Sequence, residues 1–100
     1  MDVNKEIRQA IATGKVLIGE DESLKTLKRG QAKLIIAASN CKPNVLADIE
    51  HYAKLANVPV RTFDGNSGEL GLACGKPFLV SVLTIVEEGS SNILGLGARK

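Results

Sequence analysis

Charged side chains crowd one short stretch of this chain. The stretch holds three carboxylates in succession and then four cations, namely Glu20, Asp21, Glu22, Lys25, Lys28, Arg29 and Lys33. Cations bind phosphates, and carboxylates accept hydrogen bonds from the amino or imino groups of nucleic-acid bases. Because phosphate repels a carboxylate, the acidic side chains belong near base edges and the basic ones near the backbone. These residue types therefore suit an RNA-binding surface.

Both halves of the stretch also have an ordinary structural interpretation. Acidic residues in the first turn of a helix oppose its positive N-terminus and stabilise it by about 0.3–1 kcal/mol each. Lys25, Lys28 and Arg29 are three or four residues apart, so they share one helix face, and a solvated face is the commoner role of such a run. The pattern by itself leaves both interpretations open.

Residue types for catalysis or metal binding are sparse. His51 is the single histidine, and Cys41 and Cys74 form no Cys-x-x-Cys pair. We therefore expect no metal site, no cofactor and no disulfide, with both thiols reduced in the cytosol. The glycines within 65–71 are spaced like a nucleotide fingerprint, but they follow a third strand, and we interpret them as loop and cap glycines. The sequence does not indicate an enzyme.

Two residues in expected loops have two interpretations each. Phe78 follows Gly75, Lys76 and Pro77 before a fourth strand, where its ring can pack in the core. The same ring, beside the cation of Lys76, can be a stacking platform for an unpaired base, worth about 1–3 kcal/mol. Asn40 follows a second strand and either shapes a turn or reads a base edge.

Apolar spacing predicts alternating helices and strands that position these side chains. Helices are expected over 2–13, 21–29, 44–56, from Asn66 to near Gly75, and at Ile93–Leu94; strands are expected over 16–18, 33–38, 58–63 and 79–86. Asn44 is the expected N-cap of the third helix, and Asn66 with Glu69 resembles a capping box. This alternation is typical of helices on both faces of a largely parallel sheet. The predicted fold class is α/β, a three-layer α/β/α sandwich with a central four-stranded sheet.

Length and composition agree with one globular domain over residues 1–100. The chain is 44% hydrophobic and 24% charged, no apolar run approaches the ~20 residues of a membrane span, and the N-terminus lacks a signal core, so we expect a cytosolic protein. A net charge of +2 looks small for a nucleic-acid partner. However, residues 1–42 hold eight Lys/Arg and five Asp/Glu (+3), whereas residues 43–100 hold five and six (−1). The basic excess lies beside the proposed surface.

A succession of short motifs resembles one known family. The motifs are Ile18-Gly19, Ser23-Leu24-Lys25-x-Leu27-Lys28-x-Gly30, Ala32-Lys33-Leu34-Ile35-Ile36, Ile49-Glu50-x-Tyr52-Ala53, Glu69-Leu70-Gly71, Cys74-Gly75-Lys76-x-Phe78 and Val82. In this order, over nearly all 100 residues, the chain is similar to the L-thirty-e family of large-subunit ribosomal proteins of archaea and eukaryotes. The compact length resembles the archaeal members.

The resemblance implies an RNA partner and a binding site. Members of the superfamily bind kink-turns, which are sharply bent RNA internal loops with tandem sheared G·A pairs and an extruded nucleotide. In the superfamily a Gly-x-Asn-Glu-x-x-Lys stretch contacts the guanines. Gly19, Glu22 and Lys25 match it, while Asp21 replaces the Asn and, when ionised, can only accept hydrogen bonds. Asn40 and Phe78 match positions at the RNA surface of the ribosomal branch.

The sequence thus predicts a non-catalytic rRNA-binding constituent of the large ribosomal subunit. Gly19 lets RNA approach the backbone, Glu22 accepts from base donors, and Phe78 with its loop holds the extruded or stacked base. The cations and helix amides meet phosphates or guanine acceptors. Expected partners are rRNA and neighbouring large-subunit proteins, with a monomer when isolated. The alternatives are a kink-turn binder outside the ribosome, as a small-RNA particle component or translational regulator, and a protein–protein interaction module.

Overall fold

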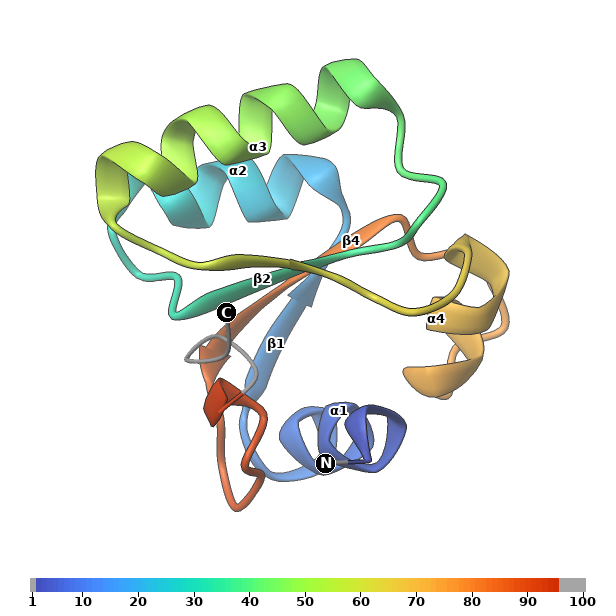
Figure 1. Ribbon diagram of the computed structural model, residues 1–100. Coiled ribbons are helices and arrows are strands. Elements are labelled where there is room, and N and C mark those ends of the chain that lie inside the picture. The colour runs from blue at the N-terminus through green and yellow to red at the C-terminus, as the bar shows by residue number, and fades with distance from the viewer. Residues whose placement is uncertain (1, 96–100) are drawn as a thin grey trace.

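The computed structural model describes residues 2–95 and contains all eight central elements expected from the sequence (Figure 1). In chain order they are α1 (Val3–Thr13), β1 (Lys15–Ile18), α2 (Glu20–Lys28), β2 (Leu34–Ala37), α3 (Pro43–Ala56), β3 (Val60–Thr62), α4 (Ser67–Ala73) and β4 (Val82–Glu87). The helix expected at Ile93–Leu94 is present in part, because Ile93 lies in a turn and a helical segment begins at Leu94.

The sheet lies between two helical layers, which confirms the predicted α/β/α sandwich. Helices α1 and α4 cover one face, and α2 and α3 cover the other (Figure 1). Ile7 of α1 packs in the cluster on the first face, and Ile49 of α3 packs in the cluster on the second. All four residues of β2 are buried, because a strand covered on both faces exposes neither side of its pleat.

The sheet is mixed, so the expectation of a largely parallel sheet is wrong. The strand order is β1-β4-β2-β3, in which only β2 and β3 are parallel neighbours, while β4 runs antiparallel to β1 and β2. The length of α4 explains this. Its seven residues span about 10 Å, too short to carry the chain back along the sheet as a parallel crossover requires. The chain therefore enters β4 at the end of the sheet where β3 finishes.

Helix caps agree with the sequence at one helix and differ at another. Asn66 and Glu69 form the predicted capping box: the Glu69 amide donates to Asn66 Oδ1 (2.9 Å) and the Asn66 amide donates to Glu69 Oε1 (3.2 Å). The predicted N-cap at Asn44 is wrong, because α3 begins at Pro43 with Lys42 as its N-cap. Proline suits the first helical position, since its φ is fixed and it has no N–H to satisfy.

Three chain segments converge at one end of the sheet. Strand β1 ends there, because Ile18 pairs with Leu83 near the start of β4. Strand β2 ends there too, because Ala37 pairs with Val82. The β1–α2 connection, the β2–α3 loop and the segment leading into β4 are therefore neighbours, and α2 starts at this end. The candidate site lies where they meet.

Candidate nucleic-acid interface

The N-cap of α2 is Gly19, whose backbone conformation requires glycine. Gly19 has a φ of 108°, which L side chains rarely adopt. A Cβ at this position would meet no atom within 4 Å, so the backbone angle, and not crowding, requires glycine. The Gly19 amide donates to the Val82 carbonyl oxygen (2.9 Å). This bond fixes the helix start against β4. Open space lies beside the Gly19 backbone, where a side chain would be.

The first turn of α2 has free amides and exposed carboxylates. Gly19 has no side chain to cap the helix, and the amides of the first turn have no acceptor within the helix. Glu20, Asp21 and Glu22 occupy this turn and are exposed. Their charges complement the helix dipole, so the capping interpretation holds. Their oxygens also remain accessible to hydrogen-bond donors on a partner.

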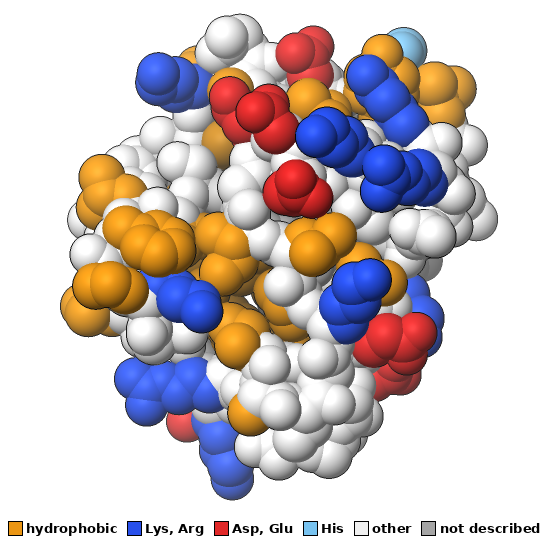
Figure 2. Space-filling view, turned by 180° about the vertical axis from the view of Figure 1, so that it is seen from behind, with side chains coloured by type: hydrophobic (Ala, Val, Ile, Leu, Met, Phe, Trp, Pro, Cys, Tyr) orange, Lys and Arg blue, Asp and Glu red, His pale blue; other side chains and the backbone are white. Residues whose placement is uncertain are grey.

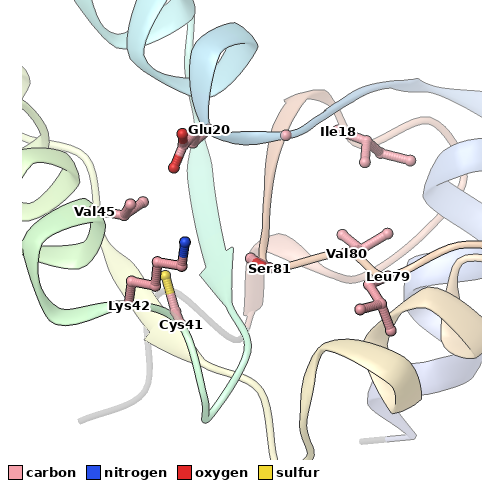
Figure 3. Close-up of a pocket in the computed structure, with 9 residues that line it drawn as sticks. Ile18, Glu20, Cys41, Lys42, Val45, Leu79, Val80 and Ser81 are labelled. Carbon is pink, nitrogen blue, oxygen red and sulfur yellow. The ribbon is translucent and has the colours of Figure 1, made fainter.

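A pocket of about 290 Å³ opens beside this helix start (Figure 3). Its walls come from all three converging segments: Ile18, Gly19, Glu20, Cys41, Lys42, Val45, Leu79, Val80 and Ser81. Figure 3 shows the Glu20 carboxylate and the Lys42 ammonium facing the same space, with Val45, Val80 and Ile18 around it. The volume is near the lower end of the range of ligand pockets, about 300–1,000 Å³. A small planar group between apolar walls and a polar rim suits this geometry.

The pocket thiol is not a reactive group. Burial, together with the charge of Glu20, raises the pKa of the Cys41 thiol. Burial also raises the pKa of Cys74 to about 11, although Lys76 opposes that shift. Both cysteines are free and buried, so both stay protonated at neutral pH. Cys41 therefore contributes an uncharged wall to the pocket.

Three of the predicted cations lie along α2 but at different distances from the pocket. Lys25, Lys28 and Arg29 are exposed, as expected. Lys25 lies one to two turns from the helix start, whereas Lys28 lies about 12 Å from Glu20 along the axis. The Lys28 ammonium lies 4.9 Å from the centroid of the Tyr52 ring, a cation–π contact. Within residues 2–95 none of the three cations forms an ion pair, so all can accept a phosphate.

The structure does not bring Lys33 to the pocket. Its ammonium lies 3.1 Å from Glu88 Oε1 and 3.9 Å from Glu87 Oε2, at the end of the sheet where β4 finishes. The hydrogen bond to Glu88 raises the pKa of Lys33, and the carboxyl pKa of Glu88 is lowered by a backbone hydrogen bond and by Lys33. Strand β2 begins at the opposite end from the pocket, so a residue that precedes it lies far from the start of α2.

Asn40 holds two parts of the fold together. Its Oδ1 accepts from the Ser67 amide (2.8 Å), and its Nδ2 donates to Ser67 Oγ (3.3 Å). Ser67 is the first residue of α4. The Asn40 side chain thus fixes the β2–α3 loop against α4, which gives its turn-shaping role a definite partner.

Phe78 lies outside the core. Its side chain is 55% exposed, and exposed Leu72 and Leu79 line the same shallow hollow, together with half-buried Lys76. Gly71 of α4 permits this arrangement, because a Cβ there would overlap the backbone oxygen of Phe78. The backbone of Phe78 is therefore held against α4. In Figure 2 orange side chains gather at the left of the face, beside a hollow with orange walls.

Sequence reasoning missed several pocket residues. Lys42 and Val45 follow the buried strand β2, and their position after its carboxyl end was a usable signal. Leu79, Val80 and Ser81 had no such signal, because they reach the pocket only when β4 runs antiparallel to β1 and β2. His51, by contrast, is an exposed α3 residue outside the pocket, in edge contact with Tyr52 (ring centroids 5.2 Å apart).

Two other site types receive no support in the part of the chain that the structure describes. No group of three or more His, Cys, Asp or Glu residues there is arranged to hold a metal ion. None of the helices in residues 2–95 combines the length and apolar character that crossing a membrane requires.

Comparisons with known proteins identify the family. A structure described as a protein of unknown function from Bacillus halodurans has a TM-score of 0.84 and 24% identity, covering 95% of this chain and 94% of that one, which supports the fold alone. The "Large ribosomal subunit protein eL30" of Methanosphaera stadtmanae is 53% identical over 94% of this chain and 96% of its own. The protein of the same description from Methanocaldococcus jannaschii is 46% identical over 100% of this chain and 91% of its own. The model of the ribosomal protein L7Ae/L30e/S12e/Gadd45 family matches residues 1–95. The chain therefore belongs to this family, and within it to the eL30 proteins of the large ribosomal subunit.

Proposed function

We propose that this protein binds rRNA at a kink-turn-type internal loop and so serves as a non-catalytic structural constituent of the large subunit. The observation that carries the proposal is the pocket at the uncapped start of α2. It combines apolar walls, exposed carboxylates and free helix amides. On cytoplasmic ribosomes, its partners would be rRNA and neighbouring large-subunit proteins. The eL30 relatives favour this placement over a kink-turn particle outside the ribosome.

The pocket suits the features that distinguish a kinked RNA from a regular helix. An extruded base offers a planar apolar face, which the walls formed by Ile18, Val45 and Val80 can cover. Sheared G·A pairs expose guanine N–H donors, for which the carboxylate of Glu22 is an acceptor. Open space beside Gly19 lets a base edge approach the backbone. Only the bent RNA presents the extruded base and the guanine edges in positions that reach the pocket, so binding selects the bent form from the ensemble.

The cations provide affinity for the backbone around this centre. Of the cations that follow the carboxylates along α2, Lys25 is the first, and it is the first choice for a contact to phosphate or to a guanine acceptor. Lys28 and Arg29 extend the contact along α2 toward an adjacent stem. Lys42, which lines the pocket, joins this set. The proposal assigns Lys33 no contact, because two carboxylates already neutralise its ammonium.

Phe78 and Asn40 have different roles in this proposal. The exposed Phe78 ring, with Leu79 beside it, provides a stacking face next to the pocket. Asn40 acts indirectly, because its hydrogen bonds to Ser67 hold the β2–α3 loop that contributes Lys42. Recognition is mainly of RNA shape, with a few base edges.

The test is a binding titration at fixed salt with two RNAs. One contains a kink-turn, and the other has its G·A pairs replaced by Watson–Crick pairs, so that length and charge are matched. We expect at least tenfold tighter binding of the kink-turn RNA. Equal affinity for the two would exclude kink-turn recognition. Co-sedimentation with large subunits after a high-salt wash tests the ribosomal placement separately.

A further inference from the structure

A second basic and apolar surface begins at the pocket and runs over the face opposite to α2. Its members are Lys5, Arg8, Leu72, Lys76, Phe78 and Leu79, which we call the α1–α4 track. Leu79 lines both the pocket and the neighbouring hollow of about 340 Å³ that contains Leu72 and Lys76. Arg8 Nη2 donates to the Leu72 carbonyl oxygen (3.4 Å). The track is therefore continuous from the pocket to α1.

The cations of the track are available to a partner. Lys5 and Arg8 are three residues apart on α1, so they share one face of the helix, and both line a hollow of about 420 Å³. Within the described residues neither they nor Lys76 forms an ion pair. In Figure 2 blue side chains lie directly beside the orange group at the left of the face.

The neighbouring carboxylates are already occupied by backbone amides. Asp2 caps α1 and accepts from the Lys5 amide (3.3 Å). Glu6 Oε1 accepts from the Asn92 amide (2.6 Å), and Glu69 belongs to the capping box of α4. The carboxylates thus have backbone partners, whereas none of the three cations in the described residues is paired with a carboxylate. The cations of the track are therefore free to bind the phosphates of a polyanion.

Exposure of the apolar members points to the same kind of partner. Leu72 is 69% exposed and Leu79 is 72% exposed, next to the exposed ring of Phe78. Apolar faces beside unpaired cations suit nucleic acid, because sugars and bases pack on the former and phosphates bind the latter. Continuity with the pocket adds a geometric reason. A bent RNA sends two stems away from the kink, and α2 and the α1–α4 track lie on opposite faces of the sheet (Figure 1).

We propose that the α1–α4 track binds the backbone of the second RNA stem leaving the kink, while α2 follows the first. This inference rests on the proposed function. Arg8, Lys5 and Lys76 contact phosphates of that stem, and Leu72 packs against its sugars. The protein thereby fixes the angle between the two stems, because it contacts both of them.

The experiment compares charge variants on full and trimmed RNAs. The test variant is Lys5→Gln with Arg8→Gln; the control is Lys15→Gln with Lys54→Gln, which removes the same charge at β1 and α3. The probes are a kink-turn RNA with two long stems and two versions that each lack one stem. Melting temperatures verify that all variants fold.

We expect a stem-specific loss. The test variant binds the full RNA about tenfold more weakly than wild type, and the slope of log affinity against log salt falls by about 1.4–1.8 for two lost phosphate contacts. On the trimmed RNA that lacks the stem bound by the α1–α4 track, the test variant and wild type bind equally. The control variant behaves as wild type on every RNA.

Three results would overturn the inference. The first is that the test variant binds the full RNA with the affinity and salt slope of wild type while it still discriminates the kink-turn from its Watson–Crick control. That result would leave the proposed function intact. Another is an equal loss on all three RNAs, which would place the effect at the pocket. The third is normal RNA binding with lost co-sedimentation, which would assign the track to a neighbouring protein. If wild type itself does not distinguish the kink-turn from its Watson–Crick control, the proposed function fails first.

Discussion

Replacing Phe78 by alanine separates RNA binding from folding. The Phe78 side chain is 55% exposed, so about half of it is already in solvent. Full burial of a Phe side chain is worth about 1.5–3 kcal/mol, and half of that is about 1 kcal/mol of unfolding free energy. In a domain of this size 1 kcal/mol lowers the melting temperature by about 4–8 °C. Loss of a stacked base costs about 1–3 kcal/mol of binding, a roughly 5- to 150-fold weaker affinity.

The chain supplies a matched control in its other phenylalanine. Phe63 is 5% exposed and packs with Leu70 in the core, so Phe63→Ala costs about 3–5 kcal/mol of stability. Thermal melts and kink-turn titrations of both variants, with Phe78→Tyr as a conservative substitution that keeps the ring, test the argument. We expect Phe78→Tyr to bind within about twofold of wild type. If Phe78→Ala binds the kink-turn RNA as tightly as wild type, the Phe78 ring does not belong to the RNA-binding surface. A loss of stability as large as that of Phe63→Ala would contradict the exposure on which the estimate rests.

Three further outcomes follow from the site. Lys25→Ala should weaken kink-turn binding by about 1–3 kcal/mol in titrations and lower the salt slope by about 1, whereas Lys54→Ala should not. Gly71→Ala and Gly14→Ala each place a methyl on a backbone oxygen and should cost about 1–3 kcal/mol in denaturant melts; only Gly71→Ala should also weaken RNA binding by the folded protein. Because burial holds the pKa of Cys74 at about 11, an alkylating reagent at pH 8 should modify this thiol only after unfolding, and rapid reaction of the native protein would refute that view.

The elements of this fold were predictable because the signals that specify them are local. Helix α1 was predictable because apolar residues such as Ile7 and Ala10 recur at helical spacing, and both residues are buried. The start of α4 was predictable from the spacing of Asn66 and Glu69. Strand order is not local. An alternating string of helices and strands does not say which pairs are parallel, and the outcome here depended on how far α4 could carry the chain.

The same distinction separates the site residues that were found from those that were not. Gly19 to Lys25 are consecutive, so one helix start brings them together however the sheet is ordered. Lys33 was grouped with them by its distance along the chain, but β2 begins at the far end of the sheet and Lys33 pairs with Glu88. Leu79 was missed for the converse reason, since 60 residues separate it from Gly19 in the sequence while both line one pocket.

The direction of β4 therefore creates the site. Had β4 run parallel to β2, the segment before it would lie at the end of the sheet that Lys33 occupies, and α2 would start beside an edge without Val80 or Leu79. Instead Gly19 donates to Val82, which fixes the helix start against the strand that this segment enters. Gly71 holds the same segment against α4 from the other side. The pocket is thus fixed on both sides by backbone contacts, and its exposed charges, Glu20 to Glu22 with Lys25 and Lys42, remain free to respond to a partner.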